Sequence, residues 1–118
     1  MSDKINRGKE GEQQAADFLM ANGYEILERN YRYKRSEIDL IAKKDNWIIF
    51  VEVKLRSSDA FGYPEEFVNR KKVLKILEGA EYYTFTHQWE GPVRYDIVSI
   101  RRQPDQPDEV VHIEDAFY

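Results

Sequence analysis

The fold of this chain is decided by residues 47–55, which read WIIFVEVKL. A strand built from this segment has apolar side chains on both faces, which is typical of a central strand covered by helices from two sides. The segment also contains Glu52 and Lys54, although glutamate and lysine are rarely buried unless they are paired. Residues two apart share one face of a strand, so these two side chains point the same way. We therefore predict a central strand that carries a charged pair on one face.

The preceding residues 36–42 alternate in polarity and predict a neighbouring strand. Alternation gives two faces, one with Glu37, Asp39 and Ile41 and the other with Ile38, Leu40 and Ala42. A two-residue turn at Asp45-Asn46 would put Asp39 directly opposite Glu52, whereas a four-residue turn would put it opposite Phe50. Both registers leave Asp39 on the face of Glu52 and Lys54. A turn of three or five residues would place it on the other face.

The rest of the chain supplies two helices and three more strands. We predict helices over residues 6–22, with Gly23 as the C-terminal cap, and over 65–83. Further strands are predicted over 24–29, 93–100 and 110–113. The order α-β-β-β-α-β-β predicts one α/β domain over residues 1–118, a mixed sheet of about five strands flanked by helices. Residues 103–108 are the only linker-like stretch, and they lie too near the end to separate domains.

The amino-acid composition restricts the cellular compartment in which the protein is expected and the partners that it is expected to bind. The chain has 118 residues and no cysteine, which suits the reducing cytoplasm, and its apolar runs are too short to predict a membrane partner. A net charge of −4 first argues against nucleic acid. However, residues 104–118 contain five acids and no lysine or arginine, whereas basic residues gather in 29–35 and 70–75. Nucleic acid therefore remains a candidate partner, with modest, salt-sensitive and metal-dependent binding and with the acidic tail away from it.

A third carboxylate is expected beside Asp39 and Glu52. Glu12 stands three, four and seven residues before Ala15, Ala16 and Leu19, on the apolar stripe of the first helix. Gly11 precedes it and would allow that helix to approach its neighbour closely. Three carboxylates together repel one another unless a cation neutralises them, and oxygen ligands favour Mg²⁺ or Mn²⁺ over zinc. The alternative, an edge-strand ion pair between Glu52 and Lys54 that discourages aggregation, stays open.

These residues resemble a known superfamily. Asp39, then Glu52-Val53-Lys54 after a hairpin, with an acidic residue on the preceding helix, is similar to the PD-(D/E)xK nucleases. More closely, the chain resembles the YraN family of bacterial proteins, described as distant relatives of Holliday-junction resolvases. The matching stretches, among others, are residues 8–12, 37–41, 50–54 with Arg56, 94–96 and 113–117. Ser36 and Val73 depart from the family, which usually has glycine and often has glutamine there.

The resemblance implies a restriction endonuclease-like fold and a metal-dependent endonuclease acting on DNA, including branched DNA. Asp39 and Glu52 would hold Mg²⁺ or Mn²⁺ with the Val53 carbonyl, and Glu12 would be an outer ligand or would orient water. Lys54 would position or activate the attacking water. A resolvase would also need to be a homodimer. The alternative is a catalytically silent nucleic-acid-binding or protein-interaction module that retains the nuclease fold.

Nucleic-acid contacts are expected from three further basic residues. Arg35 ends the basic and aromatic segment 29–35, which suits backbone contact and base stacking. Arg56 shares the strand face of Lys54, where a phosphate contact and a salt bridge are equally open. Lys72 interrupts an apolar helical stripe and faces either the site or, as a snorkelling side chain, the solvent. We predict that Arg70, Lys71 and Lys75 form a solvated helix face.

Overall fold

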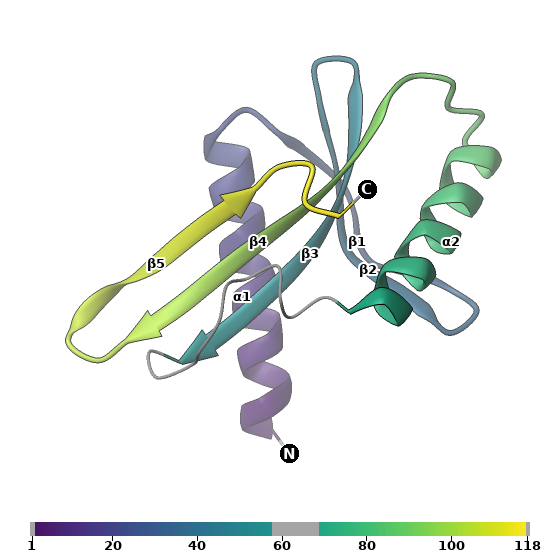
Figure 1. The fold of residues 1–118 in the computed structure, drawn as a ribbon. Coiled ribbons are helices and arrows are strands. Elements are labelled where there is room, and N and C mark those ends of the chain that lie inside the picture. The colour runs from purple at the N-terminus through teal and green to yellow at the C-terminus, as the bar shows by residue number, and fades with distance from the viewer. Residues whose placement is uncertain (1, 58–68, 118) are drawn as a thin grey trace.

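The computed structural model of this chain describes residues 2–57 and 69–117. Within these ranges the order of elements is the predicted α-β-β-β-α-β-β, which confirms the α/β class (Figure 1). Neither helix of the described ranges has an apolar stretch long enough to cross a membrane. The elements are α1 (Ser2–Ala21), β1 (Glu25–Tyr33), β2 (Ser36–Lys44), β3 (Trp47–Ser57), α2 (Arg70–Thr86), β4 (Val93–Gln103) and β5 (Gln106–Ile113).

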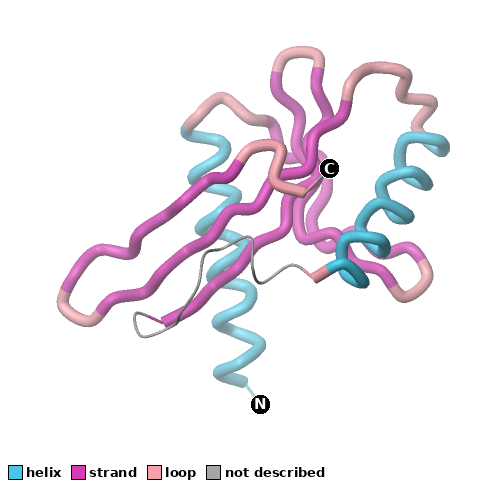
Figure 2. The backbone as a smooth tube through the Cα atoms, viewed as in Figure 1, coloured by secondary structure: helices cyan, strands magenta, loops and turns pink. Residues whose placement is uncertain are grey.

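The strands of the described chain form one sheet in the order β1-β2-β3-β4-β5. β3 and β4 run parallel, and the other neighbouring strands run antiparallel. A parallel pair requires a long crossover connection, and α2 lies in that crossover. The helices consequently lie on opposite sides of the sheet, with α2 beside the β1–β2 end (Figure 2).

Two apolar clusters cover the two faces of the sheet. The helices contribute Ala15, Ala16 and Leu19 from α1 and Ile76, Ala80 and Tyr83 from α2. β3 contributes to both clusters, because Ile49 and Val51 pack under α1 whereas Ile48 and Phe50 pack under α2. The prediction that residues 47–55 form a central strand covered from two sides is confirmed.

The first helix begins before its predicted start at residue 6 and ends at Ala21. Gly23 has a positive φ of 90°, a conformation that glycine adopts without steric cost. The N–H of Tyr24 donates to the Leu19 carbonyl at 3.0 Å, and the N–H of Gly23 donates to the Met20 carbonyl at 3.1 Å. This pair of bonds is a Schellman motif, which confirms the predicted glycine cap.

The second helix begins at Arg70, not at the predicted residue 65, and it continues to Thr86. Residues 65–68 lie outside the described part of the chain. Asn69 is extended, with φ −82° and ψ 170°, and its side chain accepts a hydrogen bond from the Lys72 N–H at 2.9 Å. An asparagine N-cap of this kind satisfies one of the free N–H groups of the first turn.

Three two-residue turns join the antiparallel neighbours. Each turn contains a residue in the left-handed region, namely Lys34 (φ 54°), Asp45 (φ 55°) and Asp105 (φ 61°). Residues 103–108, which looked linker-like, form the third of these hairpins, because Gln103 pairs with Gln106. The acidic C-terminal stretch, residues 104–118, therefore includes β5, at the sheet edge opposite β1.

Candidate active site

β2 and β3 separate at Asp39. The last pair of their ladder joins Leu40 to Val51, so of the two registers left open the two-residue turn is the one found, and Asp39 lies level with Glu52. The Val53 N–H donates to Oδ2 of Asp39 at 2.8 Å. The carboxylate thus takes the place of the backbone acceptor that β2 no longer offers, and this bond holds Asp39 beside β3.

The regular alternation predicted for residues 36–42 is wrong at Ile38. Ile38 packs in the α2 cluster with Ile41, whereas Leu40 and Ala42 pack under α1. Residues two apart share a face only in a regular strand, so the alternation of β2 breaks between Ile38 and Leu40. Asp39 lies at this break, where β2 leaves its neighbour.

Glu52 is a buried carboxylate with two lysines on one of its oxygens. Its side chain is 1% exposed, and its Oε2 contacts Nζ of Lys72 and lies 3.4 Å from Nζ of Lys54. Its other oxygen, Oε1, is buried and has no hydrogen-bond partner among the described residues. A buried charged oxygen without a partner is energetically costly, so this atom marks a place where a ligand could bind.

The carboxyls of Asp39 and Glu52, called the acidic pair below, perturb each other. Burial, and then the negative charge of Glu52, raise the pKa of the Asp39 carboxyl to about 8, against the opposing hydrogen bond from the Val53 N–H. Burial opposes the charged form of Lys72, but its ion pair with Glu52 and the charge of Asp39 outweigh burial and raise the pKa of its ammonium. Burial therefore favours the protonated form of Asp39, although two lysines lie beside Glu52.

Glu12 lies outside this pair. Its side chain is half-buried and hydrogen bonds with Asn30. Burial raises the pKa of the Glu12 carboxyl, and the charges of Glu37 and Glu52 raise it further. In residues 2–57 and 69–117, no three acidic or histidine side chains gather closely enough to hold a metal ion. The helix does approach β3 closely, since a Cβ added at Gly11 would lie 3.3 Å from Cβ of Leu55.

A cleft of about 400 Å³ opens beside Asp39. The β1–β2 hairpin forms one wall and the first two turns of α2 form the other. The cleft thus places several cations around one member of the acidic pair. Its lining residues are Arg35, Ser36, Glu37, Asp39, Asn69, Lys71, Lys72, Lys75 and Ile76.

The basic residues singled out in the sequence lie at different places relative to the cleft. Lys72 faces the site, where it contacts Glu52, and Arg35 lines the cleft as well. Lys71 and Lys75 are exposed, which confirms the predicted solvated helix face, and they also line the cleft. Arg56 is half-buried on β3 and does not line the cleft.

The acidic pair suits a hard divalent cation. The available donors are carboxylate oxygens, one of them the partnerless Oε1 of Glu52, and carboxylate oxygens favour Mg²⁺ or Mn²⁺. A cation at this place would also relieve the repulsion that raises the pKa of Asp39. The roles of the Val53 carbonyl and Glu12 as further ligands stay predictions.

The raised pKa of Asp39 predicts a pH dependence of stability. In the folded state Asp39 keeps its proton up to about pH 8, whereas in the unfolded chain it loses the proton near its ordinary value of 3.8. Its contribution to the free energy of unfolding is therefore complete below that ordinary value and falls as pH rises, by at most about 1.4 kcal/mol per pH unit, until about pH 8. Urea unfolding in EDTA from pH 5 to 9 should show the Asp39→Asn protein gaining stability relative to the parent. Asp45→Asn, in an exposed turn, is the control, and parallel curves for parent and Asp39→Asn would contradict the shift.

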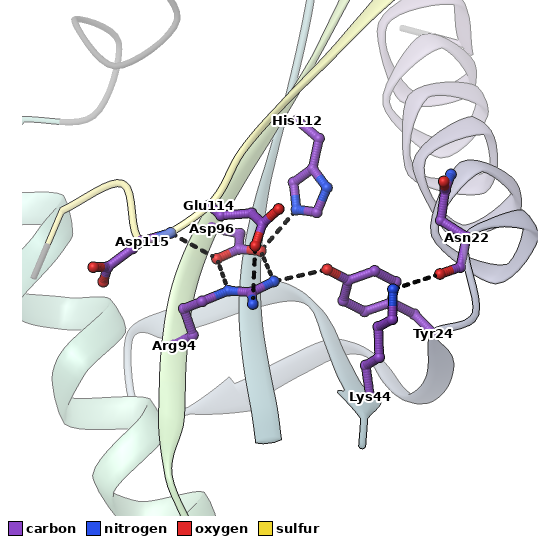
Figure 3. Close-up of polar contacts among 8 residues, drawn as sticks. All are labelled: Asn22, Tyr24, Lys44, Arg94, Asp96, His112, Glu114 and Asp115. Carbon is purple, nitrogen blue, oxygen red and sulfur yellow. Dashed lines mark hydrogen bonds and ion pairs between the residues drawn. The ribbon is translucent and has the colours of Figure 1, made fainter. Parts of the chain in front are cut away.

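A second polar cluster lies on the sheet face covered by α1 (Figure 3). The fully buried Asp96 accepts hydrogen bonds from Nε and Nη2 of Arg94, at 2.9 and 2.8 Å. Nε2 of His112 lies 2.7 Å from Oδ2 of Asp96, and the Asp115 N–H donates to Oδ1 at 3.0 Å. Arg94 also donates to the Tyr24 hydroxyl at 2.7 Å. Burial disfavours the charged form of Asp96, but the bonds from His112 and Arg94 outweigh it and lower the pKa of this carboxyl.

Comparison with known proteins gives one consistent result. A family model described as "Uncharacterised protein family UPF0102" matches residues 11–100. A UPF0102 protein of Cytophaga hutchinsonii is 50% identical over 96 residues, which cover 81% of this chain and 85% of the relative. A UPF0102 protein of Thermodesulfovibrio yellowstonii is 45% identical over 115 residues and 98% of each chain. Another, from Persephonella marina, is 43% identical over 112 residues, covering 94% of this chain and 92% of the relative. The matched range of the family model includes the acidic pair and the cleft.

Proposed function

The chain belongs to the uncharacterised protein family UPF0102. From the geometry of the cleft we propose that it is a metal-dependent endonuclease that hydrolyses phosphodiester bonds in DNA. The observation that carries the proposal is the acidic pair, which is flanked by Lys54 and whose Asp39 lines a cleft that is also lined by cations. The resemblance to the PD-(D/E)xK nucleases supports it, because the same residues carry that motif.

Each residue then has a role that its position allows. Asp39 and Glu52 would hold Mg²⁺ or Mn²⁺, and the Val53 N–H keeps Asp39 oriented toward β3. When bound, the cation supplies a water of lowered pKa and offsets negative charge at phosphorus. Lys54, one-quarter exposed beside Glu52, can orient the attacking water and face the developing charge. Lys72, on α2, holds the Glu52 carboxylate in place through an ion pair.

The two alternatives explain less of the site. A silent nucleic-acid-binding module has no need for a buried carboxylate pair, which costs several kcal/mol of desolvation per ion. A protein-interaction module is favoured by one observation, the exposed apolar side chains Leu74, Tyr82 and Phe85 on α2. These side chains lie outside the cleft and do not account for the acidic pair.

A cleavage assay tests the proposal. Linear, flapped and four-way DNA, and a matched RNA, are incubated with the protein in Mg²⁺ or Mn²⁺, with EDTA as the control. We expect internal cuts in at least one DNA that require the cation and disappear in EDTA. Paired symmetric cuts in the four-way junction would further support a homodimer, because one site cuts one strand at a time. Intact DNA in both metals, whatever its structure, would contradict the proposal.

A further inference from the structure

We infer that Arg35, Lys71 and Lys75 form a phosphate seat, a place for the backbone phosphates of a polynucleotide next to the one at the acidic pair. This inference rests on the proposed nuclease function and adds a substrate class to it. The substrate would be a strand with phosphates beyond the cleaved bond, not a mononucleotide or an isolated terminal phosphate.

The first support is that the basic residues lining the cleft fall into two groups, one that forms an ion pair and one that does not. Lys72 is committed to Glu52, with which it forms an ion pair. In contrast, Arg35, Lys71 and Lys75 form no ion pair with any other described residue, although all three line the cleft. Other arginines of the protein form ion pairs, as Arg102 does with Glu10 at 2.9 Å. The positive charge of the cleft is therefore free to meet a ligand.

The second support is spacing. Lys71 and Lys75 are four residues apart in α2, so their Cβ atoms lie about 5–6 Å from each other along one side of the helix. Two ammonium groups in such a row can contact successive phosphates of one strand. Arg35, at the end of the β1–β2 turn, faces them from the other wall. A strand lying between these walls would be contacted from both sides.

The third support is the local field. Asn69 caps α2 at the cleft, so the positive end of the helix dipole points toward it. The two acids of the lining do not cancel this field, because Glu37 has Arg32 within 3.6 Å and Asp39 lies at the acidic pair. Among ligands that present negative charge in a row, a nucleic-acid backbone is the one that the adjacent acidic pair can act on.

The experiment measures binding without catalysis. Fluorescence anisotropy of a labelled DNA that the parent binds is followed in EDTA across a salt series, for the parent, the Lys71→Ala/Lys75→Ala double variant and Arg70→Ala. Each lost phosphate contact reduces the slope of log K against log salt by about 0.7–0.9 in magnitude. We expect the double variant to lose about 1.4–1.8 of slope and at least about ten-fold in affinity at low salt. A mononucleotide at the same phosphate concentration should not displace the DNA.

Arg70 is the matched control, because it is exposed in the same turn of α2 and does not line the cleft. Its replacement should leave the slope unchanged. A double variant that keeps the parent slope, or DNA that a mononucleotide displaces efficiently, would overturn the phosphate seat while leaving the nuclease proposal standing. A parent that neither binds nor cuts DNA would overturn both. Far-UV circular dichroism verifies that the double variant is folded.

Discussion

Replacement of Lys54 by alanine is expected to lower the rate of DNA cleavage by at least about 100-fold, the scale seen when a proton-transferring or charge-stabilising group is removed. Lys54 is the cation beside Glu52 that belongs to the same strand face, and its Nζ lies 3.4 Å from Oε2. Without it, no ammonium on β3 orients the water or offsets charge at the phosphate. The loss should appear in single-turnover rates on the best DNA substrate in Mg²⁺.

The structure also predicts that this variant stays folded. Glu52 keeps its ion pair with Lys72, so the buried carboxylate is not left alone. Lys44→Ala is the matched control, since Lys44 sits at the far end of β2, where it donates to the Asn22 carbonyl at 2.9 Å. It should cleave like the parent. Parent-like cleavage by Lys54→Ala would show that the catalytic assignment is wrong, whereas an early thermal transition would show that Lys54 acts on stability.

Replacement of Asp96 by alanine is expected to reduce the free energy of unfolding by about 3–5 kcal/mol, the cost of breaking a buried ion pair by removing one partner. Asp96 is fully buried and is contacted by Arg94 and His112, so its loss leaves a guanidinium with little compensation. It also removes the acceptor that fixes the Asp115 N–H. Thermal unfolding should show a fall in Tm of more than about 10 °C.

Glu114→Gln is the control for this cluster, because Glu114 pairs with the same Arg94 at 3.1 Å but its side chain is 60% exposed. An exposed pair of this kind contributes about 0–1 kcal/mol. Two variants with equal, small losses would show that the cluster does not stabilise the fold. Cleavage by folded Asp96→Ala at low temperature should match the parent, since the cluster and the cleft lie on opposite faces of the sheet.

The relative positions of Asp39 and Glu52 were predictable because both residues belong to one hairpin of neighbouring strands. The apolar run 47–55 fixed the central strand, and the two-residue turn carried Asp39 to the level of Glu52. The break in β2 at Ile38 was not predictable, because it follows from β2 leaving β3 and not from any change in polarity. Glu12 was correctly placed on the first helix, but its distance from the pair depends on how the helix crosses the sheet.

The features that escaped prediction are those that depend on distant partners. Lys71 and Lys75 are exposed as predicted, but that they line a cleft depends on how α2 packs beside the β1–β2 hairpin. The cluster around Asp96 joins Arg94 to Tyr24, which is 70 residues away. That contact exists only once β4 has crossed over to pair in parallel with β3. The spacing of Tyr24 and Arg94 in the sequence does not indicate this contact.

The strands lie in the sheet in the same order as in the sequence, and this order affects how the site is assembled during folding. Three of the four strand pairings close loops of two residues, and only β3 and β4 must be joined across residues 58–92. Chain entropy lost on closure grows with loop length, so the contact order of this fold is concentrated in that single step. The carboxylates of the acidic pair belong to one short hairpin, whereas Lys72 belongs to the long connection. The two carboxylates of the site are thus close to each other in the sequence. Lys72, one of the lysines beside them, comes into place only when the long connection closes, which is the entropically most expensive closure of the fold.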